Sequence, residues 1–369
     1  MCYRLKHCLQ KPYNCKLVFK LGSNTNIMTF YQAWHKKAHI FLLILISFSG
    51  EYVFAQDPQF SQFYANPIYT NPAFAGTQTV GRIVTNVRQQ WPGIPGSFRT
   101  GTFSYDEHFD AINGGFGVQA SFDEQGVGTL RTIGLNVMYS YQIPVTRRFT
   151  MRAAVQAGII QKSVDFSKLT WYDQIVLGNG FINPPSESVY LQGGNLNPSI
   201  FITNFAAGIS GYSKNFYFGL AAHNLFEPTQ DFFSSGDVDK PNSIPRRFTG
   251  NMGLVIPVVE SRNPKYRANL YPNVIFKSQR QFQQLNLGMY ASRGSFLAGL
   301  YYRANAVNSD AFIILLGIRT PKVRIGYSYD ATVSEARPGA ANSHEVSLAF
   351  ELHKRIPKRT VRAMRCPEF

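Results

Sequence analysis

The sequence predicts an all-β protein, a transmembrane antiparallel β-barrel of about fourteen strands. Three observations support this fold class. Apolar and polar side chains alternate with a period of two along most of the chain, as they do on the two faces of a strand. Aromatic residues make up 14% and charged residues only 16% of the chain, against about a quarter charged in soluble domains. A hydrophobic leader precedes the alternating runs.

The leader has the layout of a secretory signal peptide. Its apolar run covers residues 40–48 and its small-residue exit ends at Ala55. The basic flank consists of His35, Lys36 and Lys37. We therefore expect a signal peptide over 28–55, translation from Met28, and an upstream extension over 1–27. A short membrane anchor is the alternative, but the apolar run is too short to span a bilayer.

The segment that follows the leader, residues 56–78, reads QDPQFSQFYANPIYTNPAFAGTQ. Its two Asn-Pro pairs, Asn66-Pro67 and Asn71-Pro72, disfavour helix and favour extended or turn geometry. Its aromatic side chains are too apolar to remain in water. We expect a short plug in the lumen or a partner ledge at the periplasmic mouth. A first strand with its lead-in is the alternative, which the prolines disfavour.

The barrel is expected over residues 79–353. In 131–143, for example, Ile133, Leu135 and Val137 alternate with Thr132 and Asn136. The predicted strands lie near 79–91, 98–106, 112–122, 130–143, 149–164, 201–212, 215–224, 247–257, 267–277, 281–291, 295–304, 311–320, 322–330 and 343–353. Their polar faces are small and neutral, which fits a polar lumen and a lipid-facing apolar surface. A large soluble all-β protein remains the alternative.

The connections between strands alternate in length. The two longest, near 165–198 and 225–246, are the fifth and the seventh, and most even-numbered ones are short. Outer-membrane barrels combine long outer loops with short periplasmic turns, so the even-numbered connections and the basic tail, 354–369, should be periplasmic. The predicted basic periplasmic face consists of Arg147, Arg148, Arg319, Lys322, Lys354, Arg355, Lys358 and Arg359. It could meet anionic lipid headgroups or dock an acidic periplasmic partner.

Three stretches of the sequence resemble a known family. They are the segment after the leader, the stretch RQQWPGIPG at Arg88 to Gly96, and the ending from SHEVSLAFEL to RCPEF. Together they are similar to the PorP/SprF family of type IX secretion outer-membrane proteins of Bacteroidetes. Glu368 departs from the family, where a basic residue is common. The resemblance spans Gln56 to Phe369, and its middle rests on the barrel pattern alone.

The resemblance implies a part in a secretion or gliding-motility apparatus in the outer membrane. It implies contacts with periplasmic and lipoprotein components, or help in delivering secreted adhesin-like substrates. The residues of the family motif that would contact a partner are Asp57, Pro58, Phe60, Phe63, Tyr64, Asn66, Pro67, Asn71, Pro72, Phe74, Gly76 and Trp91. The rival function is passive transport of small hydrophobic or nutrient molecules across the outer membrane.

No catalytic, cofactor-binding or metal site is predicted. Ser210 and His223 lack the surroundings of a barrel hydrolase site, since no nucleophile-elbow pattern is present. His344 and Glu345 are strand neighbours that must face opposite ways, so they cannot share a metal. Cys366 is a single thiol near the terminus. The basic tail lacks the interleaved aromatics of nucleic-acid binding, so lipids and machine components are the expected partners, without nucleic acid or small-molecule substrate.

Overall fold

The computed structural model describes residues 57–78, 80–126, 129–169, 198–230, 232, 243–261, 263, 266–305, 309–333 and 342–352. All of them belong to the second of two compact units, Gln56–Phe369. The predicted extension, signal peptide and basic tail, with Lys354, Arg355, Lys358 and Arg359, lie outside the described residues. Among the described residues, no helix is both long enough and apolar enough to cross a membrane.

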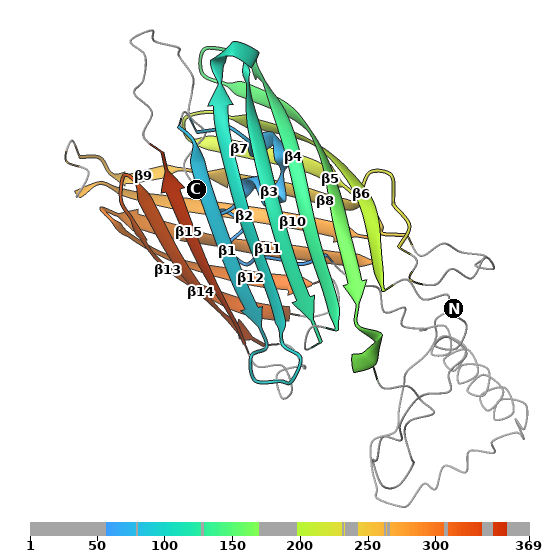
Figure 1. Cartoon of the computed structure of the whole chain (residues 1–369). Helices are drawn as coiled ribbons and strands as arrows, with labels where there is room; N and C mark the ends of the chain where they lie inside the picture. Colours follow the sequence, from blue (N-terminus) through green and yellow to red (C-terminus); the bar gives the residue numbers. More distant parts are fainter. Residues whose placement is uncertain are drawn as a thin grey trace, which may run out of the picture. The chain divides into compact units, whose positions relative to one another are not determined.

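The described chain forms one closed antiparallel sheet, as the alternation predicts (Figure 1). Its strands are β1 (Arg82–Gln90), β2 (Phe98–Phe109), β3 (Gly114–Gln125), β4 (Leu130–Pro144), β5 (Thr150–Val164), β6 (Ser199–Tyr212), β7 (Phe216–His223), β8 (Arg247–Leu254), β9 (Ile256–Val259), β10 (Ala268–Gln279), β11 (Phe282–Arg293), β12 (Phe296–Asn305), β13 (Ser309–Arg319), β14 (Val323–Thr332) and β15 (Ser343–Glu351). Each strand pairs with the next along the chain except β8, which pairs with β10, and β15 pairs with β1 to close the ring.

The ring has fourteen strands because β8 and β9 are two pieces of one strand that both pair with β10. The break falls at Val255, and the β9–β10 register shifts at Ala268/Asn269. Pro257 lies in β9 and has no N–H to donate, so it weakens the ladder at this point. The sequence predicted one strand over 247–257, and the structure extends it to Val259.

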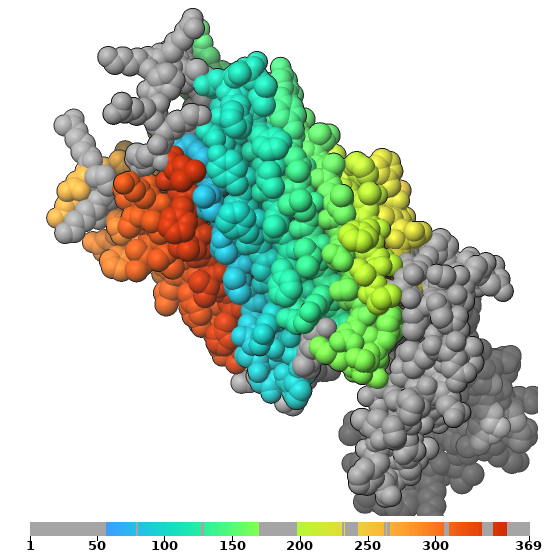
Figure 2. Space-filling model, in the orientation of Figure 1, coloured from blue at the N-terminus to red at the C-terminus, as the bar shows by residue number. Residues whose placement is uncertain are grey.

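Along each strand, successive side chains alternate between the outer face of the barrel and the lumen. In β4, Leu135 and Val137 are exposed on the outside, whereas Asn136, Met138 and Ser140 are buried in the lumen. The exposed outer face continues over β1 to β6, whose side chains form an unbroken surface in the space-filling view (Figure 2). A barrel with apolar side chains outside and polar ones inside is the arrangement that lipid requires.

The two ends of the barrel are distinct. The even rim carries the connections 110–113, 145–149, 213–215, 260–267, 294–295 and 320–322. The start of β1 and the end of β15 also lie there, since Arg82 pairs with Glu351. The odd rim carries the connections 91–97, 126–129, 165–198, 224–246, 280–281, 306–308 and 333–342. The longest connections therefore leave from the odd rim, as predicted for the outer side.

Residues 57–78, called the plug below, occupy the lumen. Phe63 and Tyr64 pack among lumenal side chains of β10 to β13, and Phe74 packs with Ile68 against β4, β6 and β7. The wall residues of the two clusters are Tyr271, Ile275, Tyr290, Tyr301, Ile313 and Leu315, and Met138, Tyr212 and Tyr217. The plug and these wall residues together form two apolar clusters inside the lumen.

The Asn-Pro pairs behave differently from the prediction. Pro67 begins a one-turn helix, α2 (Pro67–Thr70), and Pro72 begins a 3₁₀ turn, η1 (Pro72–Phe74). Proline is well suited to the first helical position, where its missing N–H would have no helical partner. The Asn71 side chain accepts a hydrogen bond from Ala73 N and so caps the second turn. Proline thus starts helical turns here instead of preventing them.

Candidate functional site

The plug begins at the odd rim. The Asp57 amide donates to Gln279 Oε1 at 3.3 Å, and its carboxylate pairs with Arg247 Nη1 at 3.1 Å. Gln279 ends β10 and Arg247 begins β8, so both mark the odd rim. The Arg247 guanidinium also lies 5.7 Å from the Tyr69 ring centroid. Burial raises the pKa of Tyr69 to about 12, which keeps its hydroxyl a donor to Pro58 O.

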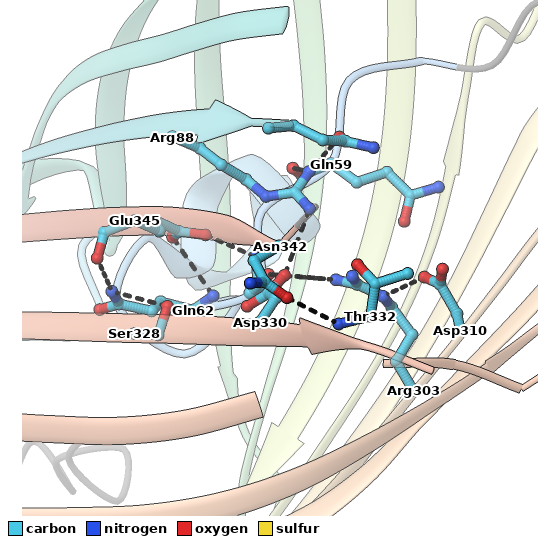
Figure 3. A network of polar contacts seen from close by, with 12 residues as sticks. Gln59, Gln62, Arg88, Arg303, Asp310, Ser328, Asp330, Thr332, Asn342 and Glu345 are labelled. Carbon is cyan, nitrogen blue, oxygen red and sulfur yellow. Dashed lines mark hydrogen bonds and ion pairs between the residues drawn. The ribbon is translucent and has the colours of Figure 1, made fainter. Parts of the chain in front are cut away.

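Glu345 receives the next part of the plug. The amides of Ser61 and Gln62 donate to its two carboxylate oxygens at 2.6 and 3.2 Å (Figure 3). Asn86 Nδ2 on β1 donates to the same carboxylate at 3.2 Å. Glu345 points inward from β15 and is only 1% exposed. Three N–H donors, two of them from the plug backbone, converge on this side chain, so Glu345 fixes the plug backbone.

The Gln62 side chain also hydrogen-bonds the barrel wall, on β14 and β15. Its Nε2 donates to Ser328 Oγ at 3.2 Å and to the Glu345 carbonyl at 3.0 Å, while Ser347 Oγ donates to its Oε1 at 2.6 Å. A Cβ on Gly326 would lie 2.6 Å from Gln62 Oε1. Glycine at that position therefore makes room for the amide.

Arg88, Asp330 and Arg303 form a buried ion network beside the plug (Figure 3). Asp330 accepts from Arg88 Nη2 at 3.2 Å, from Arg303 Nη1 at 3.0 Å and from Ser61 Oγ. Arg88 also donates to Gln59 O at 2.9 Å, and Arg303 pairs with Asp310. Buried charges persist only where each is paired and hydrogen-bonded. The network links β1, β12 and β14 to the plug.

The Asn-Pro asparagines also bind the wall. Asn66 Nδ2 donates to Thr102 Oγ1 at 3.1 Å, and Asn71 Nδ2 donates to the carbonyls of Ile209 and Leu220 at 3.0 and 3.2 Å. Close approach to the backbone of β6 and β7 depends on two glycines opposite Asn71. A Cβ on Gly208 would lie 2.2 Å from Asn71 Oδ1, and one on Gly219 would lie 2.8 Å from its Nδ2.

The plug leaves the lumen at the even rim. Gly76 has a φ of +64° and donates its N–H to Asp106 at 2.9 Å. Asp106 pairs with Arg82 at 3.0 Å. The Ala75 carbonyl accepts from Arg152 Nη1 at 2.8 Å and from Ser140 Oγ at 2.6 Å. Gly76 combines a left-handed conformation with close packing, a position that suits glycine alone.

The plug therefore crosses the lumen from the odd rim to the even rim. It turns back once, where the Thr70 carbonyl meets His223 Nε2 at 3.1 Å near the odd end of β7. Of the two arrangements expected for this segment, a plug in the lumen and a ledge at the periplasmic mouth, the structure shows the plug, with its first residues at the odd rim and its last at the even rim.

The predicted motif residues fall into two places. The plug members, from Asp57 to Gly76, lie in the lumen, so a partner would meet most of them only from inside the barrel. Trp91 lies apart, at the odd rim, and its backbone has a φ of 56°. Its backbone N–H donates a hydrogen bond to Asn342 O, and its ring centroid lies 5.4 Å from that of Phe98. The structure thus brings eleven of the twelve motif residues together and leaves Trp91 out.

Sequence reasoning missed the wall residues that hold the plug. These are Arg82, Asn86, Arg88, Asp106, Arg152, Arg303, Ser328, Asp330 and Glu345. Most are charged, and all occupy inward positions of predicted strands. An ionisable side chain on the lumenal face was the signal that could have identified them, because such a group needs a partner inside.

The residues considered as catalytic or metal-binding candidates make other contacts. Ser210 Oγ donates to Ala73 O at 3.2 Å, and His223 contacts Thr70 O, so both bind the plug backbone. His344 points outward beside Tyr327, whose hydroxyl lies 2.8 Å from its Nδ1, while Glu345 points inward. Within the described residues, no group of three or more His, Cys, Asp or Glu side chains is placed to hold a metal ion.

The even rim is basic where it is described. Arg147, Arg148 and Lys322 are exposed in its turns, and Arg319 is half-buried at the end of β13. Further exposed cations of this rim are Lys214, Arg267 and Arg293, and its exposed carboxylates are Asp110 and Glu260.

Comparison with protein families gives a match over residues 53–350, to the type IX secretion system membrane protein PorP/SprF. The chain belongs to the PorP/SprF family. The match covers the plug and nearly all of the barrel. Together with the closed sheet and its apolar outer face, it makes this PorP/SprF protein an integral barrel of the outer membrane with a role connected to secretion.

No curated protein matches the chain. Solved structures with a similar barrel include the toluene transporter TbuX of Ralstonia pickettii, at 10% identity and a TM-score of 0.45 over 78% of this chain and 94% of that one. The outer membrane protein Omp33 of Acinetobacter baumannii has 9% identity and a TM-score of 0.41 over 75% and 100% of the two chains. The toluene transporter TodX of P. putida has 11% identity and a TM-score of 0.43 over 78% of this chain and 94% of that one. These values are too low to bear on function.

Proposed function

We propose that this PorP/SprF protein is a non-enzymatic adaptor of the type IX secretion and gliding machinery. It would join the outer membrane to periplasmic and lipoprotein components of the machine, or to secreted adhesin-like substrates. The observation that carries the proposal is the plug. Its contacts run from Asp57 at the odd rim to Gly76 at the even rim, so the chain itself occupies the route that a client would take through the lumen.

The docking face would be the even rim. Its exposed cations outnumber its exposed carboxylates among the described residues. Charge of one sign favours a partner of the opposite sign and speeds their encounter. We therefore expect an acidic surface on the periplasmic partner. Anionic lipid headgroups are the competing ligand for the same cations.

The test is co-purification from cells that contain the machinery, after crosslinking. The variant Arg147→Glu/Arg148→Glu/Lys322→Glu should capture several-fold less of the periplasmic components identified by mass spectrometry. The matched control, Arg131→Glu/Lys168→Glu, reverses cations at the odd rim and should capture the wild-type amount. Equal capture by both variants would contradict docking at the even rim. Loss of membrane insertion by the first variant alone would instead assign the rim cations to lipid.

The second candidate function is passive transport of small hydrophobic or nutrient molecules. The polar inward positions of β8, β10 and β11 favour it, because they include buried side-chain oxygens of Asn251, Asn273 and Asn286 without a hydrogen-bond partner among the described residues. Liposome swelling separates the two functions. An adaptor with a fixed plug should leave swelling rates near those of empty liposomes, whereas a transporter should admit small solutes.

A further inference from the structure

Three polar side chains form a transverse row on the lumenal wall near the odd rim. Lys277 on β10 pairs in register with Thr249 on β8 and with Gln284 on β11. All three face inward and are buried, with exposed fractions of 7%, 4% and 5%. Their outward-facing chain neighbours are Phe248, Phe276 and Leu285. The row stands two positions from Gln279, where β10 ends at the odd rim.

None of the three side chains has a recorded partner within the described residues. The Lys277 ammonium makes no hydrogen bond or ion pair there, and neither do the Thr249 hydroxyl and the Gln284 amide, whose Oε1 is buried without a partner. Lys162, the other inward lysine near this rim, differs because its Nζ donates to Gln230 Oε1 at 2.7 Å. The row is therefore a set of adjacent polar groups around a lysine amine that has no partner within the described residues.

The carboxylates nearby are committed elsewhere. Asp57 pairs with Arg247, Asp330 pairs with Arg88 and Arg303, and Glu345 accepts the plug amides. The charged groups that act on Lys277 are three cations, Arg247, Arg303 and Arg88, and one carboxylate, Glu345. The three arginines are themselves paired with Asp57, Asp330 and Asp310, and none of these carboxylates pairs with Lys277.

We propose that the row Thr249–Lys277–Gln284 binds a small anion, either a carboxylate or an inorganic oxyanion. A buried lysine amine is costly to charge without a counter-ion, and a bound anion supplies that counter-ion. Neighbouring strands are about 4.8 Å apart, so the hydroxyl and the amide flank the ammonium closely enough to donate to the same anion. The site lies two positions from the odd end of β10, and it does not depend on the proposed adaptor function.

Bromide serves as the crystallographic probe. Crystals of the wild-type protein grown in sodium bromide should show an anomalous peak within hydrogen-bond distance of Lys277 Nζ. Crystals of Lys277→Met should lack that peak, and crystals of the matched control Lys162→Met should retain it. Absence of the peak in the wild type would overturn the proposal, and this measurement needs no variant that must fold. A peak that persists in Lys277→Met would overturn it as well.

A solution measurement identifies the class of anion. The unfolding midpoint of the detergent-solubilised protein is followed while sodium phosphate or sodium acetate is added. Ligand that binds only the folded state raises the midpoint as its concentration passes its dissociation constant. The rise should occur for the wild type and Lys162→Met and be lost in Lys277→Met. A rise with acetate alone indicates a carboxylate, one with phosphate alone an oxyanion, and equal rises in all three proteins would exclude the site.

Discussion

At the scale of single residues, Glu345 explains how the plug is held. Its side chain is buried, and its two oxygens accept from Ser61 N, Gln62 N and Asn86 Nδ2. Backbone amides that cannot reach water need such an acceptor, because an unsatisfied buried donor costs about 1–3 kcal/mol. Replacement of the carboxylate should therefore affect several donors at once.

We expect Glu345→Ala to lower the free energy of unfolding by about 3 kcal/mol, since it leaves buried amides without their acceptor. Equilibrium unfolding of the refolded barrel in urea measures the loss. Glu124→Ala is the matched control, because Glu124 makes an exposed pair with Arg131 at 3.4 Å and exposed pairs contribute about 0–1 kcal/mol. If the two variants lost the same stability, Glu345 would not anchor the plug.

At the scale of elements, the plug spans the seam of the barrel. The ring closes where β15 pairs with β1. Gln59 and Gln62 of the plug bind Arg88 on β1 and Glu345 on β15, and Asn86 of β1 also binds Glu345. The segment just before the first strand thus fastens the first strand to the last. Closure of a barrel removes its sheet edges, and the plug adds contacts that stabilise that closure.

The fit of η1 against β6 and β7 gives a second prediction. Gly208→Ala should be strongly destabilising on its own, because its Cβ would lie 2.2 Å from Asn71 Oδ1. Asn71→Ala should cost about 2–3 kcal/mol through its lost hydrogen bonds to Ile209 O and Leu220 O. The double variant should lose less stability than the sum of the two, since the shortened side chain removes the clash.

A double-mutant cycle in urea measures this coupling, which should reach about 1–3 kcal/mol for residues in direct contact. Gly101→Ala provides the control for adding a methyl group to a strand glycine without a clash, here on the outward face of β2, since the atom nearest to the added Cβ, Asn86 O, lies at 3.7 Å. Strict additivity of the Gly208 and Asn71 substitutions would contradict the close approach of η1 to the wall.

The strands could be predicted from the sequence because the pattern that indicates them is local. The run 130–143 became β4 (Leu130–Pro144) and the run 149–164 became β5 (Thr150–Val164), because alternation with a period of two directly reports the two faces of a strand. The plug was harder to predict. That Ser61 would meet Glu345, 284 positions away, depends on barrel closure, and no local pattern encodes it. The Asn-Pro pairs signalled a turn without revealing which wall would receive it.

At the scale of the whole molecule, the course of the plug separates the ends of the described chain. Asp57 binds the odd ends of β8 and β10, whereas Glu351 pairs with Arg82 at the even rim. Outer-membrane barrels keep their short turns on the periplasmic side, so we predict that the even rim is periplasmic. Asp57 should then lie at the outer end of the barrel, although β1 would begin at the periplasmic end.

Surface labelling of intact cells tests this topology. An epitope inserted directly before Asp57 should bind antibody on intact cells. In a Cys366→Ser background, Lys168→Cys at the odd rim should react with a membrane-impermeant maleimide, whereas Arg147→Cys should react only after the outer membrane is opened. If the epitope were hidden while Lys168→Cys reacted, the plug would not traverse the lumen. If Arg147→Cys reacted on intact cells, the barrel would have the opposite orientation, and the basic rim would face the outside of the cell.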